Sequence, residues 1–145
     1  MAEIKDIQKV KEIVKSCIFA SLATSDKGQP RVRPVSVFMV DDLSFLVATF
    51  AKTRKVAQLL GNPKVELCFV DANHRQVRVA GIASAVDSIE EKDRLMQKYL
   101  DPKMWQRFFK GPEDPNFILF KIAPRQVEWM EQEQIQYHQV ELTVK

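Results

Sequence analysis

The chain has 145 residues, of which 46% are hydrophobic and 28% charged, with only 4 glycines and 7 prolines. This length and composition predict one globular domain over 1–145 and exclude a disordered or low-complexity chain. The net charge of +3 is too small to indicate a nucleic-acid-binding protein, although it allows a local anion site.

The N-terminal residues and the cysteines predict the compartment. Residues 1–6 carry charges of both signs and lack the apolar core of a secretory signal. No apolar run approaches the roughly 20 residues needed to cross a bilayer, so we expect a cytoplasmic protein without a membrane partner. Cys17 and Cys68 lie in apolar runs and are expected to be buried, reduced thiols.

The first third of the chain predicts a helix followed by three strands. Apolar residues recur every three or four positions over 4–14, as in an amphipathic helix. The apolar run 17–24 ends in a turn sequence at 25–28, and the valine-rich run 30–40 is typical of the return strand of a hairpin. Residues 44–49 are apolar without alternation, which predicts a strand covered on both faces.

Helices and strands are mixed in the remaining chain. Helical spacing over 53–60 is followed by Gly61 and Pro63, which end a helix. Residues 64–70 and 76–86 alternate as strands, and Gly81 in mid-strand predicts a bulge or a barrel corner. A capping box at 88–91 begins another helix, and 104–109 predict a further short helical piece. Residues 116–130 form the last long strand, interrupted near Pro124, and the tail after Gln134 can add another.

These elements predict a mainly β fold with flanking helices. Closely spaced strands with short links, about six in number, favour antiparallel pairing over an alternating βαβ arrangement. A sheet with apolar residues on both faces must curl or close, and a small barrel is the simplest closure.

The segment most indicative of function leaves a buried strand at Thr49 and enters a helix at Thr53. A helix N-terminus offers free backbone N–H groups and the positive end of the helix dipole, both of which favour an anion. Thr53 adds a hydroxyl donor, Arg54 a planar fork for two phosphate oxygens, and Lys55 a compact charge. These residues predict a phosphate site; alternatively, Thr53 is only a helix cap and the two cations are solvated.

Other polar clusters give weaker signals. Arg31 and Arg33 share one strand face and are followed by Pro34, which indicates either an anion site or surface ion pairs. Gln76 begins a strand where its amide could contact the edge of a ring. No phosphate-loop, dinucleotide-binding or Cys-x-x-Cys motif is present, and His74 and His138 have no partner at metal-ligand spacing, so we expect no metal site.

Taken in order, these segments resemble the pyridoxamine 5′-phosphate oxidase-like family of FMN-binding split barrels. The resemblance rests on residues 19–24, the hairpin 26–34, the strand-to-helix turn 49–55, Asn62-Pro63, Arg75-Gln76-Val77 and the segment 124–129. It implies a six-stranded antiparallel split β-barrel that forms a homodimer with two FMN molecules between the subunits.

The resemblance also implies which residues bind FMN. Arg33, Pro34, Val35 and Ser36 would lie along the isoalloxazine ring, and Ala48 and Thr49 beside the ring and the ribityl chain. Thr53, Arg54 and Lys55 match the family's phosphate grip. Gln76 matches a glutamine that reaches the flavin from a neighbouring strand, often across the dimer.

The function implied is that of an FMN-dependent oxidoreductase with a small-molecule electron donor and acceptor, and no residue is an evident catalytic acid or base. The alternative is a non-catalytic flavin-binding or sensing protein of the same fold. Deazaflavin and haem, which some relatives bind, are less favoured cofactors. The family's C-terminal Arg-x-His substrate element has no counterpart around His138, so the resemblance does not extend to oxidation of the vitamin. It is closer to the small flavin-reductase, nitroimidazole-reductase-like and general-stress members.

Overall fold

The computed structural model describes residues 2–41 and 43–142, with side chains described from residue 6 onward. The helices are α1 (Ala2–Ser16), α2 (Arg54–Gly61), α3 (Ile89–Tyr99) and α4 (Pro102–Trp105). The strands are β1 (Ala20–Asp26), β2 (Gln29–Val35), β3 (Phe38–Met39), β4 (Phe45–Phe50), β5 (Lys64–Val70), β6 (Gln76–Ala85), β7 (Phe117–Met130) and β8 (His138–Val140). No helix in the described part of the chain is both long and apolar enough to cross a membrane.

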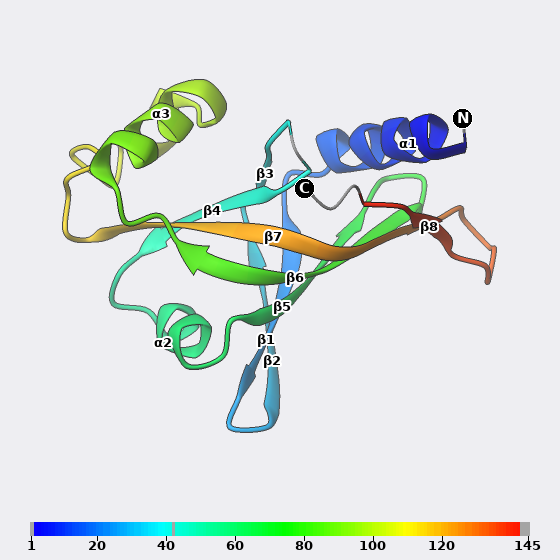
Figure 1. Ribbon diagram of the computed structural model, residues 1–145, viewed down its shortest axis with the longest axis horizontal. Helices are drawn as coiled ribbons and strands as arrows, with labels where there is room; N and C mark the ends of the chain where they lie inside the picture. The colour runs from blue at the N-terminus through cyan, green and yellow to red at the C-terminus, as the bar shows by residue number, and fades with distance from the viewer. Residues whose placement is uncertain (1, 42, 143–145) are drawn as a thin grey trace.

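All the strands belong to one antiparallel sheet in the order β2-β1-β5-β6-β7-β4-β3, with β8 paired to β7 (Figure 1). Six strands have six or more residues, whereas β3 and β8 have two and three. The predicted mainly β, antiparallel fold with flanking helices is therefore confirmed.

The sheet is a split barrel. β2 and β3 stand at opposite ends of the strand order, yet only Ser36 and Val37 separate them in the chain. The sheet must curl until its two edges approach, and no ladder joins β2 to β3 in the described pairing. The sequence pattern 30–40 predicted one strand here; the chain instead divides it, because its first half pairs with β1 and its second half with β4.

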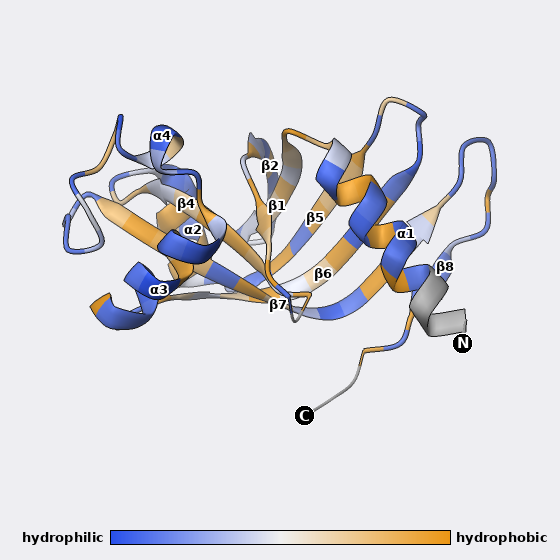
Figure 2. Cartoon of the chain, turned by 90° about the horizontal axis from the view of Figure 1, so that it is seen from above, coloured by the Kyte–Doolittle hydropathy of each residue, from blue (hydrophilic) through white to orange (hydrophobic). Residues whose placement is uncertain are grey.

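Two apolar cores lie on the two faces of this sheet. The barrel interior contains Leu22, Phe45 and Phe69, all at most 1% exposed, and is closed on one side by Val10 and Ile13 of α1. Hydrophobic and hydrophilic residues alternate along α1 (Figure 2), as expected for a helix with one packed face.

The second core lies outside the barrel, where α3 and the segment after it cover β4 and β7. It contains Leu46, Leu95, Met96, Phe117 and Leu119. β4 is consequently buried from both faces, with Phe45 in the barrel interior and Leu46 in the second core. The apolar run at 44–49 predicted this double burial.

Local chemistry explains where the elements begin and bend. Thr53 caps α2 and Ser88 caps α3, each accepting a hydrogen bond from the backbone N–H three residues on. The β6–β7 register shifts between Ala80 and Gly81, and a Cβ at Gly81 would lie 2.6 Å from the carbonyl oxygen of Ala123. The predicted bulge is thus present, and glycine allows the two backbones to approach.

Two short predictions differ from the structure. Cys17 is not in a strand: it follows α1, its Sγ donates to the carbonyl of Ile13, and β1 begins only at Ala20. The predicted helical piece at 104–109 lies earlier, at Pro102–Trp105, because Asp101 caps it and Pro102 occupies its first turn. Cys17 and Cys68 are free and half-buried.

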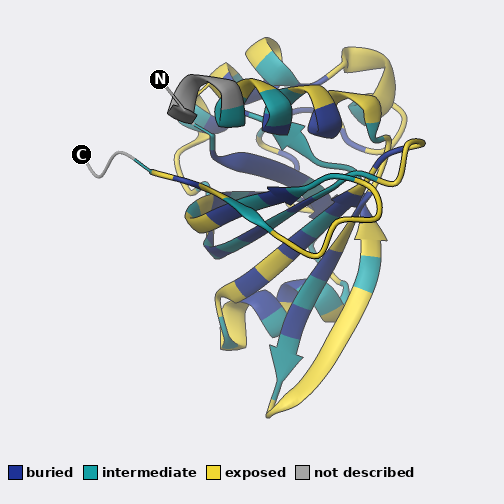
Figure 3. Cartoon of the chain, turned by 90° about the vertical axis from the view of Figure 1, so that its right-hand side faces the viewer, coloured by how far each residue is buried: buried dark blue, intermediate teal, exposed yellow. Residues whose placement is uncertain are grey.

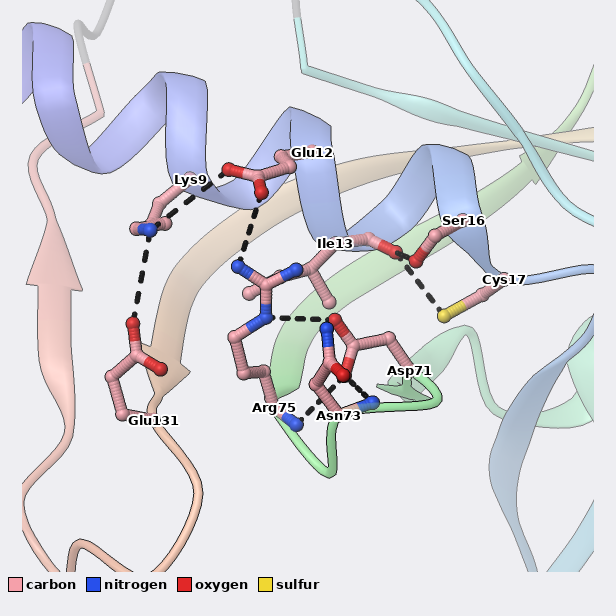
Figure 4. Close-up of polar contacts among 9 residues, drawn as sticks. All are labelled: Lys9, Glu12, Ile13, Ser16, Cys17, Asp71, Asn73, Arg75 and Glu131. Atoms are coloured by element: carbon pink, nitrogen blue, oxygen red, sulfur yellow. Dashed lines mark hydrogen bonds and ion pairs between the residues drawn. The ribbon is translucent and has the colours of Figure 1, made fainter.

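A buried carboxylate joins the β5–β6 turn to α1 (Figure 4). Asp71, whose side chain is 2% exposed, accepts hydrogen bonds from the backbone N–H groups of Asn73 and Arg75 and from Nε of Arg75. The same guanidinium pairs with Glu12 of α1 at 3.2 Å. Burial raises the pKa of Asp71, but its hydrogen bonds with Arg75 outweigh that effect, so the pKa lies below its usual value. The turn and the helix are therefore held together by one charged network.

Candidate functional site

A cavity of about 390 Å³ opens where the ends of β2 and β4 meet α2 and the α3–α4 segment. This volume is typical of a small-molecule or cofactor site. Its lining residues come from five parts of the chain: Phe19, Pro34, Val35, Ser36, Phe38, Ala48, Thr49, Phe50, Lys55, Leu100, Met104, Trp105, Phe108 and Phe109. Lys55 is the one charged residue among them, so the cavity is an apolar space with a single cationic corner.

The N-terminus of α2 forms that corner. Thr53 has extended backbone angles and its Oγ1 accepts from the N–H of Val56 at 3.4 Å. The hydroxyl itself donates to the carbonyl of Phe50 at 3.2 Å. The first turn of α2 contains no acidic residue, although carboxylates are favoured there by the helix dipole. The positive end of the helix is thus left without a negative group of its own.

Lys55 turns from α2 toward the end of β4. Its Nζ donates to Oγ1 of Thr49 at 2.6 Å, and the Thr49 side chain is buried. Burial, and secondarily the charge of Arg33, lower the pKa of Lys55 below the usual lysine value. Both effects indicate that the Lys55 ammonium is partly removed from water and has no counter-ion among the described residues.

Arg33 lies next to this corner, on β2, and is held by neutral oxygens. Its Nη1 donates to Thr24 Oγ1 at 2.8 Å and to the carbonyl of Leu22 at 3.3 Å, and its Nη2 donates to Oε1 of Gln58. Thr24 also donates to Gln58 at 2.7 Å. β1, β2 and α2 are therefore connected through one guanidinium. Arg33 forms no ion pair with a carboxylate of the described residues, so the surface ion-pair alternative is wrong for this residue.

Arg54 lies on the other side of the α2 N-terminus. It is exposed and lines a second hollow with the β1–β2 turn, formed by Ser25, Asp26, Lys27, Gly28, Arg54, Ala57, Gln58, Gly61 and Asn62.

Arg31, Arg33, Arg54 and Lys55 form a cationic cluster around the start of α2. Burial lowers the pKa of Arg33, and the charges of Arg31 and Arg54 lower it further. No carboxylate of the described residues lies within 4.0 Å of any of the four cations. Mutual repulsion of this kind is relieved by a bound anion.

The structure brings together most of the residues predicted to bind a cofactor. Pro34, Val35, Ser36, Ala48, Thr49 and Lys55 line the cavity. Thr53, Arg54 and Arg33 do not line it: Thr53 caps α2, Arg54 lines the second hollow, and the guanidinium of Arg33 is turned toward Thr24 and Gln58.

Gln76 is separate from these residues within one chain. It begins β6, opposite Met130 of β7 and Val70 of β5, and lines neither cavity. Its Oε1 accepts from the Tyr137 hydroxyl at 3.5 Å. The α2 end of the sheet, where β5 starts, is the opposite end of these strands (Figure 1).

One entire wall of the cavity was not predicted from the sequence. Met104, Trp105, Phe108 and Phe109 follow α3 and face β4 across the cavity, and Phe50 meets Phe109 with a centroid separation of 4.9 Å. Three aromatic residues within five positions are a sequence signal for this wall, but the spacing at 104–109 by itself predicts only a short helix.

Neither histidine contributes to the cavity. His138 stacks on Trp129 with a centroid separation of 4.3 Å, and His74 is a turn residue with φ 60°. No cluster of three or more His, Cys, Asp or Glu side chains suited to a metal ion occurs within the described residues.

The model of the pyridoxamine 5′-phosphate oxidase family matches residues 7–131 of this chain. The chain belongs to this family. The resemblance noted in the sequence is thereby confirmed, and the match spans strands β1 to β7, α2 and the α3–α4 segment. Among relatives of the family, General stress protein 26 of Bacillus subtilis is 32% identical over 130 residues, which cover 85% of this chain and 86% of the relative. The pyridoxine/pyridoxamine 5′-phosphate oxidase of Blochmanniella pennsylvanica is 38% identical over 84 residues, covering 57% of this chain but only 38% of the oxidase.

Solved structures share the fold of this chain. A NimC/NimA family protein from Clostridium acetobutylicum superposes with a TM-score of 0.78 at 18% identity, covering 95% of this chain and 93% of the other. A pyridoxamine 5′-phosphate oxidase-related, FMN-binding protein from Nostoc punctiforme gives 0.70 at 20% identity, covering 92% and 85%. A haem-binding protein from Mycobacterium smegmatis gives 0.73 at 15% identity, covering 88% and 55%. At these identities the similarity establishes the split-barrel fold.

Proposed function

We propose that this chain binds FMN and acts as an FMN-dependent oxidoreductase. The observation that carries the proposal is the cationic cluster at the N-terminus of α2, which has no carboxylate partner among the described residues and adjoins an apolar cavity. FMN combines the two chemistries that such a site needs, a doubly charged phosphate and a large planar ring.

The phosphate would be held by the start of α2. Free backbone N–H groups, the Thr53 hydroxyl, and the charges of Arg54 and Lys55 are donors without an anionic acceptor there. Arg33 would act indirectly, because its guanidinium is committed to Thr24 and Gln58. Its charge raises the positive potential at Lys55 without needing to contact the ligand.

The ring would lie against the sheet side of the cavity. Pro34, Val35, Ser36, Ala48 and Thr49 supply a mostly apolar surface with two hydroxyl groups, which suits a planar heterocycle with a polar edge. When bound, FMN would supply hydride and electron transfer. This chain's residues would bind and orient it and exclude water.

Haem fits the described site less well. Haem iron is held by His, Cys, Met or Tyr side chains, and of these types the cavity lining contains only Met104, whereas neither His74 nor His138 lines it. FMN is therefore the favoured cofactor of this proposal.

The cofactor site would be completed by a second copy of the chain. β2 is exposed along most of its length, and its hairpin with β1 extends from the body of the protein (Figure 3). Three apolar residues on β2 or near it are strongly exposed: Val32 of β2 (69%), and Ile18 (80%) and Phe19 (60%), which precede β1. Symmetric pairing of two chains would cover this apolar surface. Gln76, remote from the cavity of its own chain, would then approach the partner's flavin. A monomer by light scattering would contradict this arrangement.

Removal of both cations tests the phosphate grip. The double variant Arg54→Ala/Lys55→Ala is expected to purify with little flavin, whereas Arg94→Ala, which removes an exposed cation of α3, should retain the wild-type flavin content. If the double variant keeps its full flavin absorbance, the proposed grip is wrong.

Catalysis is tested separately from binding. NAD(P)H-driven turnover of an electron acceptor by the flavin-loaded protein supports the oxidoreductase. Stoichiometric flavin without turnover for any donor and acceptor would favour the alternative, a flavin-binding or sensing protein.

A further inference from the structure

The cavity has a second side that the proposed cofactor contacts do not use. Leu100, Met104, Trp105, Phe108 and Phe109 line it from the end of α3, from α4 and from the turn that follows. With Phe50 from the end of β4 they form what we call the aromatic wall.

The aromatic wall is a fixed surface. Phe109 is 8% exposed and packs on the buried Phe117 with a centroid separation of 4.2 Å. Phe117 is in turn held by Lys92 of α3, whose Nζ donates to its carbonyl at 2.7 Å and lies 4.4 Å from the ring centroid. The inner part of the wall is therefore anchored in the second core.

The outer part of the wall carries aromatic surface that remains in water. Phe50 and Phe108 meet edge to face with a centroid separation of 5.7 Å, yet they are 45% and 58% exposed, and Met104 is 45% exposed. Large apolar side chains gathered at the mouth of a cavity are typical of a ligand site rather than of an ordinary surface. Thioether and aromatic groups together favour contact with a flat ring.

Charge defines the ligand further. The ionic residues of the same segment, Asp101, Lys103, Arg107 and Lys110, are exposed and do not line the cavity. The one lining cation, Lys55, lies with Thr49 at the α2 corner. An anionic group placed against the wall would lose water without meeting a cationic side chain, because the wall's one side-chain donor is the neutral indole N–H of Trp105, and this loss is unfavourable.

We propose that the aromatic wall binds an uncharged, planar aromatic substrate, such as a quinone, and that it discriminates against ligands carrying their own phosphate or carboxylate. The proposal rests on the proposed FMN function, because it assigns Lys55 to the cofactor and the wall to the second reactant.

A matched pair of ligands tests the charge preference. Binding of 2-(hydroxymethyl)anthraquinone and of anthraquinone-2-carboxylate to FMN-saturated protein is compared by calorimetry without a reductant, so that no turnover occurs. The neutral ligand should bind more tightly. Equal or tighter binding of the carboxylate would overturn the proposal.

Two variants test the location. Phe108→Ala should weaken binding of the neutral anthraquinone about three- to tenfold, the range expected for loss of one aromatic contact. Ile135→Ala, at a 97% exposed apolar residue outside the cavity, should leave binding unchanged. Unchanged affinity in Phe108→Ala, with its folding verified by circular dichroism, would refute the wall as the binding surface.

Flavin content separates this proposal from the proposed function. If wild-type protein binds no FMN, the proposed function fails, whatever the anthraquinones do. If Phe108→Ala loses FMN while Ile135→Ala keeps it, the wall belongs to the cofactor and the present proposal fails alone.

Discussion

Replacement of Lys55 by methionine should separate cofactor binding from stability. The substitution keeps an unbranched chain of similar length and removes one half-buried charge that hydrogen-bonds to Thr49 and is repelled by Arg33. If Lys55 holds the phosphate of FMN, the variant loses a charged hydrogen bond worth about 1–3 kcal/mol. That loss corresponds to about a 5- to 150-fold weaker affinity for FMN.

The same substitution should not harm the cofactor-free protein. Burial and Arg33 lower the pKa of Lys55, so the folded state binds this proton less tightly than the unfolded chain does. Stability of the apoprotein therefore increases, rather than falls, as pH rises through the range in which Lys55 deprotonates. Removal of the charge should likewise leave the free energy of unfolding unchanged or raise it, within about 0.5 kcal/mol.

Flavin fluorescence quenching measures the affinity, and thermal unfolding of the apoprotein measures stability. Affinity for FMN in the wild type should decline as pH rises through the lowered pKa of Lys55, and Lys55→Met should lack this decline. Lys64→Met, at an exposed lysine of β5, is the control and should show neither effect. An apoprotein destabilised by more than about 1 kcal/mol with unchanged FMN affinity would show that Lys55 is structural, and the reasoning would be wrong.

Two further predictions concern the scaffold. Asp71→Asn should lower the free energy of unfolding by about 1.5–3 kcal/mol, because the charged hydrogen bonds with Arg75 are weakened. Since the folded pKa of Asp71 is lowered, the stabilisation by Asp71 in the wild type should be present above about pH 3.9 and disappear as pH falls through the folded pKa. An acid-unfolding profile identical in both proteins would contradict this. Gly81→Ala should destabilise the fold by about 1–3 kcal/mol in chemical denaturation, because the new Cβ meets the Ala123 carbonyl. Gly61→Ala has open space and lies in a helix, so a gain of about 0.5–1 kcal/mol is expected there; equal effects at the two glycines would refute the bulge argument.

The sequence predicted the elements wherever a local rule acts over a few residues. Thr53 and Ser88 could be recognised as helix caps, Gly81 as a bulge, and 44–49 as a doubly covered strand. The division of 30–40 into β2 and β3 was not predictable in this way, because both halves have strand-forming residues. What separates them is the choice of partner, β1 for one and β4 for the other.

The candidate phosphate site could be predicted from the sequence because Thr53, Arg54 and Lys55 are consecutive and the physics of a helix N-terminus is local. The tertiary structure alone decided which groups surround it. Gln58 reaches Arg33 from α2 and Phe108 reaches Phe50 from 58 positions away, contacts set by the curl of the sheet and by the way α3 packs on β4. Backbone periodicity extends over one element, whereas such neighbours depend on strand order and register. The sequence therefore determined that a hydroxyl group and two cations follow one another at a helix N-terminus, and the fold determined that an apolar, aromatic cavity lies beside Lys55.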